Sequence, residues 1–159
     1  MNIVEAAEAF GKPVSHIEAV ALGRMMDGKP TLRGSSDPLF RGDPALHNPE
    51  DLLVAALSSC HMLSYLAHAA RAGLHVLAYE DDATGTMTFA GGGGRFTDVL
   101  LRPRVTIAAG ADAALAEALH GRAHDDCFIA ASCNFPVRHE ATIERGSGHV
   151  PAGTSPVLR

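Results

Sequence analysis

The sequence has no basic tract and a modest excess of negative charge. Lys and Arg number 13 against 18 Asp and Glu, which gives a formal net charge of −5 at pH 7. Proteins that follow a nucleic-acid backbone or an anionic membrane surface do so through clusters of positive charge. We therefore expect no nucleic acid and no membrane among the partners of this protein.

Signals for export and for disulfide-stabilised folding are missing as well. Glu5 and Glu8 stand where a signal peptide would need a basic region followed by an apolar core, so we expect a cytoplasmic protein. Cysteine is scarce, at Cys60, Cys127 and Cys133. An odd count in a reducing compartment is more typical of reactive or buried thiols than of structural disulfides.

No internal repeat is visible in the chain. At 159 residues, with 47% hydrophobic and 19% charged residues, the chain is long enough for one core of its own. We predict a single domain over residues 1–159, with an atypical N-terminal segment at 1–30 and a loose tail rich in glycine and proline at 145–159.

One long helix is the strongest pattern. Asn48 is a good N-cap, Pro49 suits the first helical position, and Glu50 and Asp51 place negative charge at the positive end of the dipole. Neither proline nor glycine follows until Gly73, a natural residue for a helix to end at. About 24 residues at 1.5 Å each predict a helix about 36 Å long.

The run from Leu52 to Ala70 is uncharged and just long enough to span a membrane. Its apolar positions are largely alanine, it holds three serines and two histidines, and neither end has a basic cluster. A buried helix of a soluble protein explains the run better. Because apolar residues occupy nearly every face, we expect other structure to cover this helix all round.

Strands and further helices are predicted around the long helix. Two β-like runs, 74–89 and 95–107, are joined by a glycine turn at 91–94 into a hairpin, and Pro103 predicts a break or an edge in its second arm. The remaining elements are a turn-rich loop over 31–47, a helix capped by Asp112 that ends near His124, a short helical segment around 127–132 and a strand over 135–143.

This order of elements predicts an α+β fold, because strands and helices fall in separate runs. A helix about 36 Å long and apolar on all sides is hard to cover with one small sheet. We therefore predict a homodimer whose antiparallel sheets enclose two long central helices.

Cys60 and Cys127 are the candidates for chemistry. A single cysteine in an apolar helix is most often a small buried hydrophobe, but polar or ionisable residues border each of these two. The thiolate is the reactive form, and Cys60 lies too far from the start of its helix to gain from the dipole. It needs a cation from elsewhere, and the arginines of the preceding loop are the candidates.

A metal site competes for the same region. His120, His124 and Cys127 could in principle hold zinc, but no fourth ligand is evident, and the two histidines also suit the end of a helix as cations. We predict no metal. His61 and His68 are expected only to line the long helix. The glycine run at 91–94 lacks the pattern of a phosphate loop, and no cofactor is predicted.

Two motifs resemble a known family. The first is Asn-Pro-Glu-Asp-Leu-Leu at 48–53, continued by Ser-Ser-Cys-His-Met-Leu at 58–63, and the second is Ala-His-Asp-Asp-Cys-Phe-Ile-Ala at 123–130. Together they resemble the OsmC/Ohr family of thiol peroxidases over about residues 28–144. The segment 34–44 looks like the OsmC-like branch in particular.

The resemblance implies an enzyme, a thiol-dependent hydroperoxide reductase that acts as an intertwined homodimer in oxidative-stress defence. The family reduces organic hydroperoxides, and hydrogen peroxide to a lesser degree, and is recycled by dithiols, lipoyl groups among them. Cys60 would be the peroxidatic thiolate that becomes a sulfenic acid, and Cys127 the resolving thiol that forms a disulfide with it. Glu50 matches the family carboxylate, and Arg41 is our choice for the arginine beside the thiolate.

Alternatives stay open on three points. Residues 1–27 are rich in alanine and contain no Trp, unlike the family's N-terminal strands, so Arg24 and Arg33 compete with Arg41. Cys133 is either a buried bystander or a competitor for the disulfide. The alternative function is that of a non-catalytic dimeric protein of the same fold that binds a small ligand.

The spacing of Glu50 and Cys60 has a geometric consequence. Ten positions on one helix place them about 15 Å apart along its axis, so they cannot touch within one chain. If Glu50 helps to organise the Cys60 site, it comes from the partner subunit. The sequence therefore predicts an active site at the dimer interface.

Overall fold

The computed structural model describes residues 17–18, 28, 30, 32–90 and 93–146. The chain falls into two compact units, residues 1–53 and 54–159. The predicted tail beyond Gly146 and most of the segment 1–30, with Arg24, lie outside the described residues.

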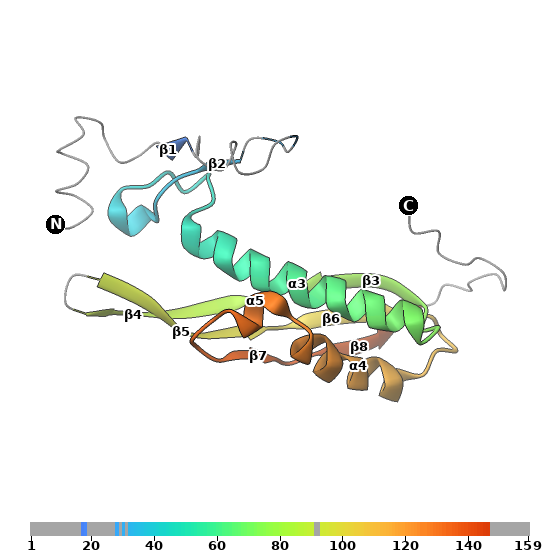
Figure 1. Cartoon of the computed structure of the whole chain (residues 1–159). Helices are drawn as coiled ribbons and strands as arrows, with labels where there is room; N and C mark the ends of the chain where they lie inside the picture. Colours follow the sequence, from blue (N-terminus) through green and yellow to red (C-terminus); the bar gives the residue numbers. More distant parts are fainter. Residues whose placement is uncertain (1–16, 19–27, 29, 31, 91–92, 147–159) are drawn as a thin grey trace. The chain divides into compact units, whose positions relative to one another are not determined.

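Helix α3 (Pro49–Arg71) is the long helix that the sequence predicts (Figure 1). A capping box closes its start: Asn48 Oδ1 accepts from the Asp51 N–H at 2.7 Å, and Asp51 Oδ2 accepts from the Asn48 N–H at 3.1 Å. Gly73 follows its end with a φ of 69°, in the left-handed region that favours glycine. Its 23 residues span about 35 Å, so the predicted helix and both of its ends are confirmed.

A single chain covers only one face of α3. The buried residues repeat about once per turn: Leu57, His61, Tyr65 and Ala69. The exposed stripe repeats in the same way on the opposite side: Ala55, Ser59, Leu63 and Ala67. The expectation that the helix is covered all round is therefore not met within one copy of the chain. In the described residues, α3 is the one helix long and apolar enough to cross a membrane, a test that core helices of soluble proteins also pass.

Two three-stranded sheets accompany α3 in the second unit. The first has the order β3–β6–β8, formed by β3 (Val76–Asp81), β6 (Pro103–Ile107) and β8 (Thr142–Arg145). The second has the order β4–β5–β7, formed by β4 (Thr84–Ala90), β5 (Gly93–Leu101) and β7 (Val137–His139).

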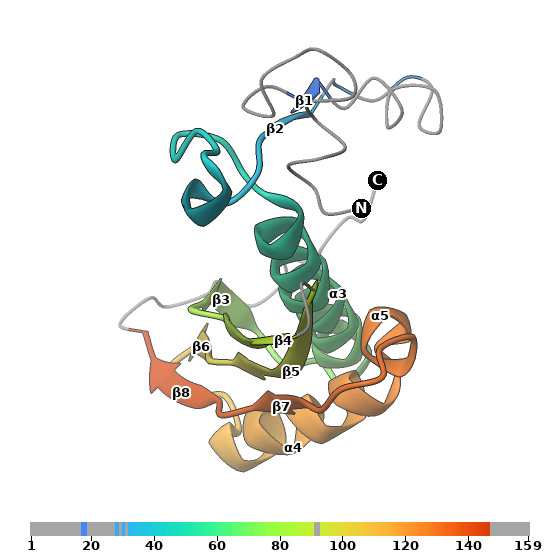
Figure 2. The same cartoon turned by 90° about the vertical axis from the view of Figure 1, so that its left-hand side faces the viewer.

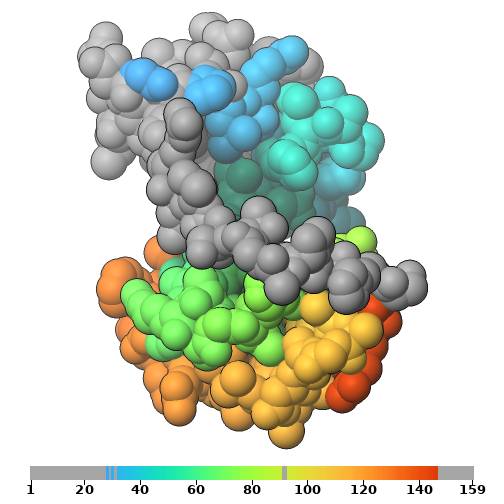
Figure 3. Space-filling model, turned by 90° about the vertical axis from the view of Figure 1, so that its right-hand side faces the viewer, coloured from blue at the N-terminus to red at the C-terminus, as the bar shows by residue number. Residues whose placement is uncertain are grey.

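The pairing of these strands is mixed. β3–β6 and β4–β5 are antiparallel, whereas β5–β7 and β6–β8 are parallel. The strands of both sheets form one curved layer beside α3 (Figure 2), and β3, β6 and β8 lie side by side in green, gold and red on one face (Figure 3). The predicted α+β class is confirmed.

Each long strand that the sequence predicts is split between the two sheets. The run 74–89 becomes β3 and β4, the run 95–107 becomes β5 and β6, and the run 135–143 becomes β7 and β8. Pro103 marks the break in the second run, as predicted. The Arg102 N–H before it donates to Asp81 Oδ1 at 2.7 Å, which satisfies the backbone where the chain changes sheets.

The arms of the predicted hairpin are confirmed. β4 and β5 pair in antiparallel fashion as far as Ala90 and Gly93. Residues 91–92, which join the two strands, lie outside the described residues.

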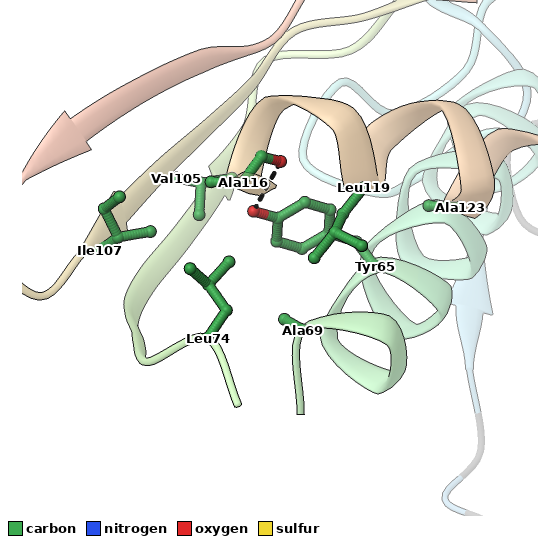
Figure 4. Packing of buried hydrophobic residues seen from close by; sticks show 8 residues of the cluster. All are labelled: Tyr65, Ala69, Leu74, Val105, Ile107, Ala116, Leu119 and Ala123. Carbon is green, nitrogen blue, oxygen red and sulfur yellow. Dashed lines mark hydrogen bonds between the residues drawn. The ribbon is translucent and has the colours of Figure 1, made fainter. Parts of the chain in front are cut away.

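Helix α4 (Ala113–Asp125) completes the core of the second unit. Its predicted N-cap is confirmed, because Asp112 Oδ1 accepts from the N–H groups of Ala114 and Leu115 at 2.9 and 3.1 Å. Side chains from α3, β6 and α4 meet around Tyr65, whose hydroxyl donates to the Ala116 carbonyl at 3.2 Å (Figure 4). The short helix predicted next is α5 (Phe128–Ala131).

The described part of the first unit consists of short elements. β1 (Ile17–Glu18) pairs in antiparallel fashion with β2 (Arg33–Gly34). η1 (Pro38–Phe40) is a single turn of 3-10 helix with Asp37 as its N-cap. The turn-rich loop predicted over 31–47 therefore contains a two-residue strand and one helical turn.

Candidate active site

The fold brings together Cys60 from the middle of α3 and Cys127 from the start of α5. Cys60 is near enough to the Cys127 thiol to raise its pKa, and both cysteines are free. Cys60 is partly exposed, whereas Cys127 is 2% exposed. These are the two cysteines that the sequence motifs single out, and the fold makes them neighbours.

Cys127 occupies the junction between α4 and α5. Its N–H donates to the His124 carbonyl at 3.1 Å, and its Sγ caps α5 by accepting from the Ala130 N–H at 3.5 Å. Burial raises the pKa of the Cys127 thiol; the neighbouring Cys60 also raises this pKa, and the Ala130 N–H lowers it. With burial as the largest influence, Cys127 is a neutral thiol at pH 7, which is not the form that attacks first.

Arg41 belongs to the first unit and follows η1. Its φ of 65° makes it the one non-glycine residue with positive φ in the described part of the chain. The turn is tightly wound, since the Arg41 N–H donates to the Pro38 carbonyl at 3.0 Å and the Gly42 N–H to the Asp37 carbonyl at 3.1 Å. Such a conformation is unfavourable for a side chain like arginine and is concentrated at functional sites.

Glu50 and Cys60 are not brought together within one chain. Glu50 lies partly buried in the first turn of α3, ten positions before Cys60 and so about 15 Å from it along the axis. Arg33, the described alternative to Arg41, is exposed in β2.

Cys133 and the three possible zinc ligands, His120, His124 and Cys127, lie in or next to α4 and α5. The Cys133 thiol donates to the Ile129 carbonyl at 3.3 Å, so it is engaged by the backbone of α5. Among the described residues, no group of three or more His, Cys, Asp or Glu side chains is arranged to hold a metal ion. His120, one of the three possible zinc ligands, bonds to His61 instead.

A buried histidine pair is the main polar feature that the sequence does not predict. His61 Nε2 and His120 Nδ1 lie 3.0 Å apart, with exposures of 1% and 0%. Burial, followed by the charges of neighbouring histidines, lowers the pKa of His61 to about 4 and the pKa of His120 to about 3. Both rings are therefore neutral at pH 7. The spacing of His61 from Leu57 and Tyr65, four positions each way, is the pattern that could have placed it in the core.

Comparison with known proteins places the chain in a family. A family model described as OsmC-like protein matches residues 42–142. A solved structure of an OsmC-like protein of unknown function from Vibrio cholerae is 35% identical, with a TM-score of 0.67, over 74% of this chain and 80% of that chain. A search of curated proteins found no match.

Two organic hydroperoxide resistance proteins share the fold at lower identity. OhrB of Bacillus subtilis is 20% identical, with a TM-score of 0.59, over 83% of this chain and 93% of that chain. OsmC of Legionella pneumophila is 19% identical, with a TM-score of 0.56, over 75% of this chain and 85% of that chain. Because the family model covers more than half of the sequence and the Vibrio relative is 35% identical, this chain belongs to the OsmC-like protein family.

Proposed function

We propose that this protein is a thiol-dependent hydroperoxide reductase with Cys60 and Cys127 as its redox pair. The observation that carries the proposal is that two free cysteines, Cys60 in α3 and Cys127 at the start of α5, are neighbours in the fold. The family includes organic hydroperoxide resistance proteins, which supports organic hydroperoxides as the main substrates. Hydrogen peroxide as a poorer substrate follows only from the resemblance of the sequence motifs to the family.

The proposed cycle has three steps. The Cys60 thiolate attacks the outer oxygen of ROOH, the O–O bond breaks, and the alcohol ROH leaves after taking up a proton, so that Cys60 becomes a sulfenic acid. The Cys127 sulfur then attacks the Cys60 sulfur, the S–O bond breaks, and the hydroxyl leaves as water with the thiol proton. A dithiol, such as a lipoyl group, reduces the resulting disulfide by exchange. The raised pKa of Cys127 argues against Cys127 as the thiol that attacks the peroxide in the first step.

Arg41 and Glu50 complete the proposed site. The guanidinium would stabilise the Cys60 thiolate, and Glu50 would orient the guanidinium. The positive φ of Arg41 supports a functional role for this residue. Since Glu50 and Cys60 lie about 15 Å apart along α3, Glu50 would serve the site of a second copy. The exposed small and apolar residues along α3 support a homodimer, which we expect to be cytoplasmic.

Thiol titration tests the redox pair. Reduced protein is titrated before and after one equivalent of cumene hydroperoxide. Wild type should lose two of its three thiols, and Cys133→Ser should also lose two. Cys60→Ser should lose none, and Cys127→Ser should hold a sulfenic acid that dimedone traps. If no thiol is lost within minutes, the proposal fails, and small-ligand binding becomes the function to examine.

Mixed dimers test the shared site. Cys60→Ser and Glu50→Gln are each expected to be inactive alone. A dimer of one Cys60→Ser chain and one Glu50→Gln chain keeps one intact site, with Cys60 from the Glu50→Gln chain and Glu50 from the Cys60→Ser chain. Unfolding and refolding the two variants together should therefore restore peroxidase activity. If the mixture stays as inactive as its components, Glu50 does not act across the interface.

A further inference from the structure

The corner between α4 and α5 is held to α3 at two points. One is the place where Cys127 neighbours Cys60 and has its pKa raised by it. The other is His68, whose Nε2 lies 2.8 Å from Asp126 Oδ2, with the His68 side chain 17% exposed and that of Asp126 61% exposed. His68 was expected only to line the long helix, and the structure instead shows it in contact with the residue directly before Cys127.

The backbone makes Asp126 and Cys127 move together. Asp126 is the C-cap of α4, and its N–H donates to the Arg122 carbonyl at 3.1 Å. Cys127 is the N-cap of α5, and its carbonyl accepts from the Ala131 N–H at 3.0 Å. Each residue is thus part of a helix end, and no loop separates them. A displacement of Asp126 from α3 would therefore also displace the Cys127 sulfur from Cys60.

Two further polar contacts join α3 to residues in the interior of α4. Tyr65 donates to the Ala116 carbonyl, and His61 bonds to His120. They hold the body of α4 on α3. The His68–Asp126 pair differs in acting at the last residue before the resolving cysteine.

Disulfide formation makes strict demands on this corner. The two sulfurs must approach to about 2.05 Å with the Cα atoms about 4.4–6.8 Å apart, so small displacements matter. We propose that His68 and Asp126 are positioning residues that hold Cys127 where its sulfur can close the disulfide with Cys60. Their role in a catalytic cycle rests on the proposed function, whereas their effect on the disulfide itself does not.

The reaction that they would favour is balanced without a cofactor. The sulfenic acid of Cys60 and the thiol of Cys127 give one disulfide and one water. With glutathione as the external couple, oxidised glutathione and the two protein thiols give the same protein disulfide and two reduced glutathiones. The second reaction tests the geometry without any peroxide.

The first experiment measures the equilibrium constant of the Cys60–Cys127 disulfide in glutathione redox buffers. All proteins carry Cys133→Ser, so that no third thiol interferes. His68→Leu and Asp126→Ala should each lower the constant about two- to fivefold, in keeping with the modest strength of polar pairs that are partly exposed to solvent. The double variant should show no further fall. His68→Gln keeps an N–H donor and should recover most of the wild-type value.

A matched control removes a comparable pair elsewhere. Arg138 binds Asp98 through two hydrogen bonds, of 2.8 and 2.7 Å, which join β5 to β7 and not α3 to α4. Asp98→Asn should leave the disulfide constant unchanged. The proposal is overturned if His68→Leu and Asp126→Ala leave the constant unchanged, or if their effects add fully in the double variant.

The second experiment separates this proposal from the proposed function. After a pulse of cumene hydroperoxide, His68→Leu should oxidise Cys60 as fast as wild type but close the disulfide more slowly, so that dimedone traps more sulfenic acid. A slower first step with unchanged closure contradicts a positioning role. If peroxide oxidises no thiol in any variant, the peroxidase function fails, and the glutathione equilibrium still decides the role of His68 and Asp126.

Discussion

Acid should destabilise this protein through the buried pair of His61 and His120. The pKa of His61 is lowered from 6.5 to about 4, mainly by burial and then by the charges of His139 and His124. The pKa of His120 is lowered from 6.5 to about 3, again mainly by burial and then by His61 and His139. In the unfolded chain both rings take up protons below pH 6.5, while in the folded chain they stay neutral.

The sign and size of the effect follow from these values. Since the unfolded state binds more protons between pH 6.5 and 4, the free energy of unfolding falls as the pH is lowered through this window. At pH 5 each ring contributes a loss of about 2 kcal/mol relative to pH 7.5, or about 4 kcal/mol for the pair. Below the folded pKa values the loss levels off.

Urea denaturation at pH 7.5 and pH 5.0 measures this loss. The double variant His61→Leu/His120→Leu removes both rings together, so neither histidine is left with a missing partner. It should lose about 4 kcal/mol less between the two pH values than wild type. Proton NMR titration of the imidazole rings provides a direct check in the folded protein. Proton uptake by His61 or His120 above pH 6, or an equal loss of stability in wild type and the double variant, would contradict the lowered pKa values.

Two further substitutions test the local structure. Asp112→Ala removes the acceptor for two N–H groups at the start of α4 and should lower the free energy of unfolding, measured by urea denaturation, by about 1 kcal/mol. Asp112→Asn keeps an acceptor and should lower the free energy of unfolding by less. Equal losses in the two variants would contradict the capping role. Gly42→Ala would place a Cβ 1.5 Å from the Ser36 carbonyl oxygen, so the turn must open. Hydrogen exchange at the amide of residue 42 should show that its protection falls by about 1–3 kcal/mol. The control is Gly110→Ala, whose added Cβ has nothing within 4 Å and should leave the exchange of that amide unchanged. Unaltered exchange in Gly42→Ala would contradict the close approach of residue 42 to Ser36.

The helices were predictable from the sequence because their ends are defined by neighbouring residues. The hydrogen bonds between Asn48 and Asp51 span three positions, and Asp112 bonds to groups two and three positions away. Gly73 stops α3 through its own backbone conformation. Short contacts of this kind depend little on the rest of the fold, so residue type alone indicates them.

The strands were only half predictable. Alternating and β-branched residues indicated extended chain at 74–89 and 95–107, but nothing local showed that each run serves two sheets. Pro103 was the exception, because a missing N–H is visible in the sequence. The other changes of sheet, around residues 82–83 and 140–141, depend on which strands lie alongside.

The candidate site also combines features set by neighbouring residues with features set by contacts between distant residues. By itself, the sequence determined the helix that carries Cys60, the short helix that follows Cys127, and the two motifs that single out these cysteines. Only the tertiary structure decided that the two thiols lie side by side, that His61 is buried against His120, and that His68 reaches Asp126. The physical reason is the separation along the chain. Contacts between residues about 60 positions apart cost loop-closure entropy, and the packing of the whole core offsets that cost. The type of a single residue therefore does not show which distant residue it will contact.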